Sequence, residues 1–222
     1  MQFENVAICG LAHVDAHQRI PSSLFEERIA GTMKRLGLPT TMLRDVAGIE
    51  ARRWWDEGFG PSQAASLAAE KVLEESGVPR ERLGVVVNTS VCRDYIEPST
   101  ASLVHQSLGL GPNCLNFDLG NACLGFLNAM EVVGMMLEQG QIDYGLVVDG
   151  EQSRDVQEAT LDRIANSEMD LNTFRAQFAT LTLGSGAVAM ILTRRELAPE
   201  GHRFVGGVNV AATEHAGLCR GQ

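Results

Sequence analysis

The chain has 222 residues, a length that suits one large domain or two small ones. Hydrophobic residues make up 45% and charged residues 21%, as in a globular protein with an ordinary core, and the formal net charge is −10. This acidic balance argues against nucleic-acid binding, which usually needs a basic face, but it leaves room for an anionic substrate at a local basic patch. No run of 18 or more apolar residues occurs, so we expect no membrane span.

The cysteines form no metal-binding or disulfide pattern. Their number is odd, and no two are separated by two residues; they are Cys9, Cys92, Cys114, Cys123 and Cys219. We therefore expect neither a zinc site nor a disulfide framework. The first ten residues lack the basic stretch and long apolar core of a signal peptide, so the expected setting is the reducing cytoplasm.

Strand and helix patterns begin to alternate near the start of the chain. Residues 6–14 read as a buried strand and residues 22–37 as a helix, in which Ser23 and Glu26 would form a capping box. Residues 48–58 are expected to form an exposed turn region.

The middle of the chain continues this alternation. The predicted helices are 62–77 and 99–109, and the β-branched run at 83–90 predicts a strand covered on both faces. A strand is predicted at 114–120. A helix follows at 123–140, apolar on nearly all sides and therefore expected to be buried throughout.

The last third predicts a strand at 144–151, polar helices within 152–178 and a glycine-interrupted strand at 181–196. Strands that alternate with helices indicate an α/β layered fold with a largely parallel sheet. Neither a short internal repeat nor a low-complexity segment occurs.

Cys123 stands at the junction between a strand and a long helix, in the sequence Asn-Ala-Cys. Cysteine attacks as the thiolate, and the free N–H groups of a helix start stabilise negative charge on a sulfur or on an oxyanion. The small residues Ala122 and Gly125 are expected to leave room around the sulfur. The competing interpretation is a buried filler, because free cysteine is among the most buried residue types.

Four motifs connect this junction with a known family. They are "NTSVCRDYIEPSTASLVHQSLGL" (88–110), "NACLGFLNAM" (121–130), "YGLVVDGE" (144–151) and "LTLGSGAVAM" (181–190). With them, the chain resembles the first part of a thiolase-fold condensing enzyme of the ketoacyl-ACP synthase III type. Within that group "DVAGIEARRWWD", "RDYIEPSTAS" and "VVDGE" are most similar to the OleA branch, which begins olefin and β-lactone hydrocarbon synthesis.

The resemblance implies a fold and a domain division. The fold is the α/β thiolase fold, layered α-β-α-β-α, of which this chain would supply the N-terminal half and the start of the second half. Residues 1–196 would form the first half with the catalytic cysteine, and residues 197–222 would begin the second. The resemblance also implies a homodimer, acyl-CoA as substrate, no cofactor besides the coenzyme A thioesters, and downstream hydrocarbon-biosynthesis enzymes as further partners.

The resemblance assigns roles to four residues. Cys123 would accept the acyl group of a long-chain acyl-CoA, and Glu97 would reach the partner's active site as the base that deprotonates a second acyl-CoA. Non-decarboxylative Claisen condensation would then give a β-keto acid or a β-ketoacyl-CoA. Arg52 and Arg53 match an arginine pair that meets coenzyme A phosphates. Without the resemblance, Glu97 would be a solvated loop carboxylate and the arginines part of a solvated turn.

Several alternatives stay open at this point. A decarboxylative synthase that uses malonyl-ACP needs no base such as Glu97, and a non-catalytic half-fold that only binds or dimerises needs neither Glu97 nor Cys123. A reactive-cysteine hydrolase would need a histidine partner. The family takes a histidine and an asparagine from its second half, and none of the five histidines here has the matching sequence context.

Overall fold

The computed structural model describes residues 1–217, and its main feature is one six-stranded mixed sheet in the order β5-β4-β6-β7-β1-β8. Its strands are β1 (Val6–Asp15), β4 (Leu83–Asn88), β5 (Leu115–Asp118), β6 (Tyr144–Glu151), β7 (Gly186–Arg194) and β8 (His202–Arg203). Residues 218–222, which include Cys219 and the end of the segment expected at 197–222, lie outside the described residues.

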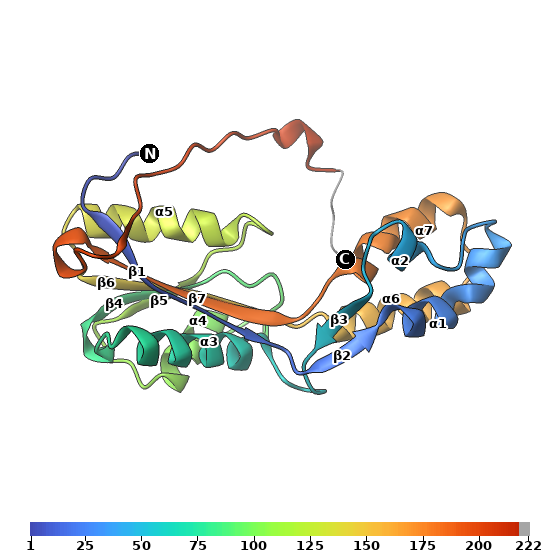
Figure 1. Cartoon of the computed structure of the whole chain (residues 1–222), viewed down its shortest axis with the longest axis horizontal. Coiled ribbons are helices and arrows are strands. Elements are labelled where there is room, and N and C mark those ends of the chain that lie inside the picture. The colour runs from blue at the N-terminus through green and yellow to red at the C-terminus, as the bar shows by residue number, and fades with distance from the viewer. Residues whose placement is uncertain (218–222) are drawn as a thin grey trace.

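The sheet is not largely parallel, as the alternation of elements predicted. Strand β4 pairs in parallel with β5 and β6, but β6–β7, β7–β1 and β1–β8 are antiparallel. The reason is the connection between β6 and β7. It runs through helices α6 (Arg154–Asn166) and α7 (Leu171–Phe178), which lie beyond the end of the sheet and do not cross its face, so β7 returns in the opposite direction (Figure 1).

Helices cover both faces of this sheet. Helices α3 (Pro61–Ser76) and α4 (Thr100–Ser107) lie on one face, and α5 (Gly125–Glu138) lies on the other (Figure 1). The pleat of β4 divides its residues accordingly, since Val86 packs in the cluster under α3 and α4 whereas Val85 and Val87 pack in the cluster under α5. The predicted burial of this strand on both faces is confirmed.

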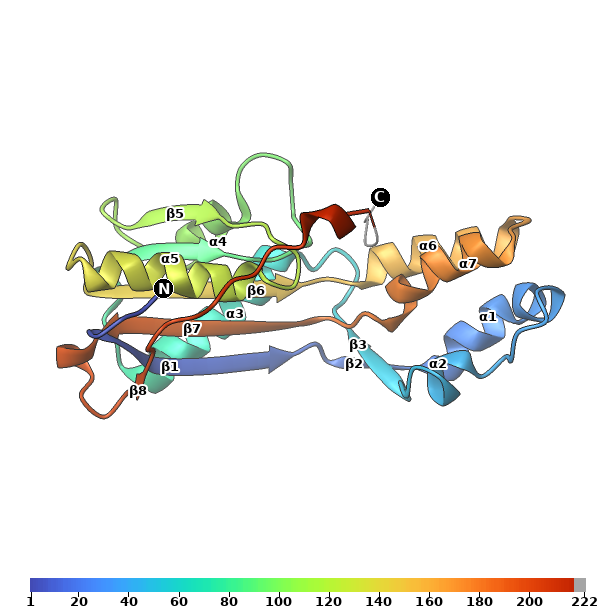
Figure 2. The same ribbon diagram turned by 90° about the horizontal axis from the view of Figure 1, so that it is seen from above.

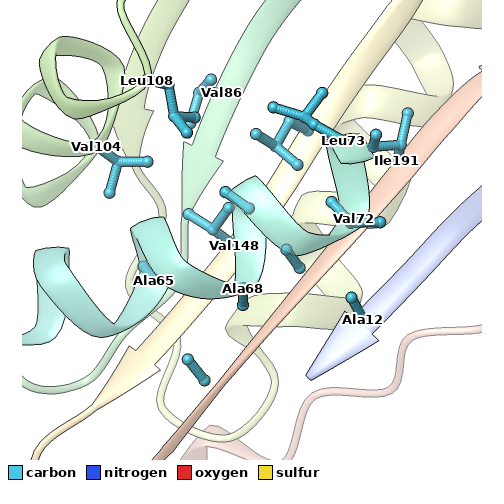
Figure 3. Packing of buried hydrophobic residues seen from close by; sticks show 14 of the residues in the cluster. Ala12, Ala65, Ala68, Val72, Leu73, Val86, Val104, Leu108, Val148 and Ile191 are labelled. Carbon is cyan, nitrogen blue, oxygen red and sulfur yellow. The ribbon is translucent and has the colours of Figure 1, made fainter. Parts of the chain in front are cut away.

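Small side chains bring α3 close to the sheet. Figure 3 shows Ala65, Ala68 and Val72 of the helix packed over Val148 and Ile191 of the strands. All five side chains are fully buried. The alanine-rich pattern therefore serves close helix–sheet packing.

A second part of the structure lies beyond one end of the sheet (Figures 1 and 2). It contains the two-stranded sheet of β2 (Gln18–Pro21) and β3 (Ala51–Trp54), and helices α1 (Ser22–Arg35), α2 (Met42–Asp45), α6 and α7. Short 3-10 helices are η1 (Arg80–Arg82), η2 (Ala179–Thr182), η3 (Arg195–Leu197) and η4 (Thr213–His215).

Two local predictions in this second part of the structure are wrong. The region 48–58 contains strand β3 and two tryptophans that are buried, not exposed. Both indole groups have partners inside the protein: that of Trp54 donates to Gln157 Oε1 at 2.5 Å, and that of Trp55 donates to the Glu151 carbonyl at 3.1 Å. The capping box does not form either. Pro21 is the N-cap of α1, and the buried Glu26 carboxylate instead accepts the Leu43 and Arg44 N–H groups of α2.

Helix α5 is not buried throughout. The sheet covers one side of it, and Leu124, Leu127 and Met135, at or just before the helix, remain exposed on the other. In residues 1–217 no helix combines the length and apolarity that crossing a membrane requires. The same residues contain no cluster of three or more histidine, cysteine, aspartate or glutamate side chains arranged to hold a metal ion.

Candidate functional site

Cys123 lies in a tight turn between β5 and α5, which we call the Cys123 turn (residues 119–124). The Leu124 N–H donates to the Asn121 carbonyl and the Gly125 N–H to the Ala122 carbonyl, each at 3.0 Å. The helix begins at Gly125, two residues later than predicted. The nucleophile candidate thus lies just before the first helical turn, where the positive end of the helix dipole favours a negative charge.

The backbone immediately before Cys123 is strained. Ala122 has φ = +44°, and it is the only non-glycine residue with positive φ in the part of the chain that the structure describes. Such a conformation costs an alanine about 1–2 kcal/mol. Strain of this kind persists where surrounding contacts enforce it and often occurs at functional sites.

Gly125 determines how closely the start of α5 approaches the sheet. A Cβ atom at this position would lie 3.1 Å from the Leu119 carbonyl oxygen and 3.2 Å from the Thr89 carbonyl oxygen. Gly125 is therefore needed for close packing of the helix start against the residues that follow β4 and β5.

Exposure distinguishes Cys123 from the other described cysteines. Its side chain is exposed, whereas Cys114 is buried and Cys9 and Cys92 are half-buried. Burial raises the pKa of the Cys9 and Cys114 thiols to about 11 and that of Cys92 to about 12. These three thiols are therefore protonated at neutral pH, and their low thiolate content makes them poor nucleophiles.

Glu97 lies in the loop between β4 and α4, which we call the Glu97 loop (residues 89–99). Both β4 and β5 point their carboxyl ends to the same edge of the sheet, so the Glu97 loop and the Cys123 turn emerge at the same end. Figure 2 shows the Glu97 loop projecting beyond β5. Glu97 is exposed, and it has no hydrogen-bond or ion-pair partner among the described residues.

Three carboxylates fasten the Glu97 loop along its length. Glu151, at the end of β6, accepts the Val91 N–H at 2.6 Å and the Cys92 N–H at 3.2 Å. Asp94 accepts the Ser62 N–H at the start of α3 at 3.1 Å.

The third carboxylate is Asp118, the last residue of β5. It accepts the Thr100 N–H at 3.0 Å and the Ala101 N–H at 2.8 Å, at the start of α4. Its Oδ1 atom also accepts the Asn88 amide at 3.2 Å. The loop is thereby held at its start, middle and end, while its tip stays free.

The tip of the loop carries apolar side chains into solvent. Ile96 is 92% exposed and Tyr95 is 61% exposed. A held loop with an exposed apolar tip next to a carboxylate is a surface on which another protein chain can pack.

A further carboxyl group lies below the start of α5. Asp149 of β6 accepts the Thr89 hydroxyl at 2.7 Å, and the Thr89 Cβ lies 3.3 Å from the position of a Cβ on Gly125. Burial, and then the charge of the nearby Glu151, raises the pKa of Asp149 to about 6. This carboxyl group is half-buried, and it changes charge close to neutral pH.

The two arginines have different environments. Arg52 is 5% exposed, its guanidinium lies 4.0 Å from the Phe25 ring centre, and its Nη2 atom donates to the Ser22 hydroxyl. Arg52 is thus buried in this structure, and its expected contact with coenzyme A phosphates stays a prediction. Arg53 donates to the Ala16 carbonyl and keeps 45% of its side chain exposed, so of the pair it is the accessible cation.

The sequence singles out Cys123 and Glu97 as candidates but not the residues that hold their segments in place. Asp118, Asp149 and Glu151 each stand at or near the end of a predicted strand, where side chains of parallel strands meet at one edge of a sheet. Their position at the strand ends was the one sign in the sequence that they could lie near the site. Their hydrogen-bond partners are 17 to 60 residues away, and the sequence pattern does not reveal them.

Comparison with known proteins gives consistent matches. The family model described as 3-oxoacyl-[acyl-carrier-protein (ACP)] synthase III matches residues 117–210. The chain is 49% identical over 221 residues to an acyl-CoA:acyl-CoA alkyltransferase of Xanthomonas campestris, covering 100% of this chain and 65% of the relative. It is 37% identical to the protein of the same name from Shewanella oneidensis, covering 99% of this chain and 64% of the relative.

A solved structure agrees with these matches. Cerulenin-bound OleA of Xanthomonas campestris superposes with a TM-score of 0.97 at 49% identity, covering all of this chain and 64% of that one. The chain thus spans slightly less than two thirds of the length of the relatives that it matches.

Proposed function

Because the chain belongs to the ketoacyl-ACP synthase III-like family of thiolase-fold condensing enzymes, we propose that it acts in the non-decarboxylative condensation of two long-chain acyl-CoA molecules. The observation that carries this proposal is the exposed Cys123, held before the start of α5 by a strained turn. The names of the alkyltransferase relatives support the choice of acyl-CoA for both substrates.

In the first step, the Cys123 thiolate attacks the thioester carbonyl of one acyl-CoA. The carbon–sulfur bond to coenzyme A breaks, coenzyme A leaves as its thiolate, and the acyl group stays on Cys123 as a new thioester. The position of Cys123 before the first helical turn supports this step, because the positive end of the helix dipole stabilises the developing negative charge.

In the second step, Glu97 from the partner subunit removes a proton from the α-carbon of a second acyl-CoA. The resulting carbanion attacks the acyl-enzyme carbonyl, a carbon–carbon bond forms, and the Cys123 thiolate leaves. The product is a β-ketoacyl-CoA, and Glu97 passes its proton to the Cys123 thiolate. The Glu97 carboxylate can then activate a water molecule that hydrolyses the thioester to the β-keto acid and coenzyme A. The exposed apolar loop tip beside Glu97 supports its insertion into a second copy of the chain, and hence a homodimer.

Two further assignments belong to the same proposal. Arg53 is the candidate for the coenzyme A phosphates, supported by a side chain that is 45% exposed and whose guanidinium, among the described residues, pairs only with the exposed Asp15 carboxylate and the Ala16 carbonyl. Residues 1–196 are proposed as the first half of the thiolase fold and residues 197–222 as the start of the second, whose side chains would cover the exposed side of α5.

The acyl-enzyme step is tested by intact-mass measurement of the full-length protein before and after incubation with myristoyl-CoA. We expect the protein to gain one myristoyl group, and Cys123→Ala to gain none. Cys92→Ala is the matched control, because the Cys92 thiol is half-buried with its pKa raised to about 12 and should not react. Acylation of the Cys123→Ala variant, or of neither the wild type nor the control, would contradict the assignment.

A further inference from the structure

Asp118 lies between the segments that carry Cys123 and Glu97, and it has no role in the proposed steps. It is the last residue of β5, and the Cys123 turn begins at the next residue. Its carboxylate binds the first two N–H groups of α4, where the Glu97 loop ends. One side chain therefore joins the segment that carries the nucleophile to the segment that carries the base.

The geometry of this contact is specific. The two oxygens of Asp118 accept one N–H each, Oδ2 from Thr100 at 3.0 Å and Oδ1 from Ala101 at 2.8 Å. A carboxylate at a helix start forms charge-assisted hydrogen bonds and interacts favourably with the helix dipole.

Asn88 completes the arrangement from the neighbouring strand. Its side-chain amide donates to Asp118 Oδ1 at 3.2 Å, and its backbone carbonyl accepts the Leu119 N–H of the Cys123 turn at 2.8 Å. The ends of β4 and β5, the Cys123 turn and the start of α4 are thus bonded into one unit.

We propose that Asp118 is a positioning residue that couples the two active sites of the dimer. This inference rests on the proposed function, in which Glu97 serves the partner's site. Asp118 then orders the nucleophile of its own subunit through the Cys123 turn and the base of the other site through the Glu97 loop. A substitution at Asp118 in one subunit should therefore change both sites, each in a different step.

The test uses a heterodimer with a single complete site. Two differently tagged full-length chains are co-expressed, one with Cys123→Ala and the other with Glu97→Gln, and the mixed dimer is isolated through both tags. The first chain then supplies only the base and the second chain supplies only the nucleophile. Two rates are measured: acylation of Cys123 by myristoyl-CoA, and formation of the condensed product.

Asp118→Asn is then introduced into one chain at a time. In the chain that supplies Glu97, we expect condensation to fall about tenfold while acylation of the other chain stays unchanged, because a small displacement of a catalytic group already costs this much. In the chain that supplies Cys123, we expect acylation itself to fall. A residue that only stabilised the fold would not separate the two steps in this way.

Asp170→Asn is the matched control. Asp170 also accepts a helix N–H, from Thr173 at 2.8 Å, but it caps α7, outside the unit that joins the Cys123 turn to the Glu97 loop. The control should leave both rates unchanged in either chain.

If Asp118→Asn were to match this control in both chains while the parent heterodimer is active, the coupling would be wrong and the proposed function would stand. An inactive parent heterodimer, beside active wild-type dimers, would overturn the exchange of Glu97 and the coupling together.

Thr100→Pro tests the same contact if Asp118→Asn does not fold. Thr100 is the first residue of α4, where proline is tolerated, and the substitution removes the N–H that Asp118 accepts. The hydroxyl that is lost has no hydrogen-bond partner among the described residues. In the chain that supplies Glu97, this variant should also lower condensation and leave acylation unchanged; unchanged condensation would overturn the coupling.

Discussion

At the scale of single residues, the site depends on contrasts between side chains of the same type. Cys123 is exposed in a strained turn, while the thiols of Cys9, Cys92 and Cys114 are held protonated by burial. Glu97 is exposed at a loop tip, while the nearby carboxylates Asp118 and Glu151 are used to hold backbone N–H groups. The environment of each group, and not its type, distinguishes the proposed reactive residues from the supporting ones.

Asp149 gives a prediction about pH at this scale. Its pKa in the folded state is about 6, above the ordinary value of 3.8, so the folded protein holds this proton to higher pH than the unfolded chain does. The contribution of the protonated Asp149 to the free energy of unfolding is complete below about pH 4 and is lost as the pH rises through 6. Asp149→Asn keeps a neutral group and should therefore gain about 2 kcal/mol relative to the wild type between pH 4 and 7, allowing for partial solvent screening.

The measurement is the free energy of unfolding of both proteins at several pH values in this window. Asp170→Asn is the control for the sign of the change in unfolding free energy. Hydrogen bonds from Thr173 lower the pKa of Asp170, so removal of this carboxylate should cost stability as the pH rises. Parallel pH curves for the wild type and Asp149→Asn would contradict the account.

At the scale of elements, the contact between the start of α5 and the end of β4 determines where Cys123, the proposed nucleophile, lies. Gly125→Ala places a Cβ about 3.1–3.2 Å from two carbonyl oxygens, so the helix start must move outward. We expect a loss of about 1–3 kcal/mol in unfolding free energy and slower acylation of Cys123.

Gly31→Ala in α1 is the matched control for this substitution. Nothing lies within 4 Å of the added methyl group, and alanine is the better helix former, so the variant should gain up to about 1 kcal/mol. Equal effects of the two substitutions, measured by denaturant unfolding, would mean that the close approach at Gly125 has no consequence.

Sequence reasoning worked best where a single element decides the pattern. The long β-branched run of β4 and the alanine-rich face of α3 predicted their structures directly, since each pattern reports burial of the element that carries it. Prediction from the sequence failed where a residue distant in the sequence determines the hydrogen bonds that a side chain forms. Glu26 and Ser23 match a capping box, but α2 supplies stronger partners for the Glu26 carboxylate.

At the scale of the whole molecule, the predicted thiolase fold is confirmed by the superposition on OleA structures. The strand directions were not predictable, because they depend on whether the connection between β6 and β7 crosses the sheet or lies beyond its end. The site was predictable in part. The resemblance pointed to Cys123 and Glu97, whereas the bonds from Asp118 that join their segments required the three-dimensional structure.

The central claim is that Cys123 and Glu97 act in successive steps, and one measurement tests it most directly. The full-length Glu97→Gln variant is incubated with myristoyl-CoA, and acylated protein and condensed product are quantified by mass spectrometry. We predict that the acyl group accumulates on Cys123 while condensed product falls by at least about 100-fold, as expected when a general base is removed. Condensed product at the wild-type rate would contradict the account.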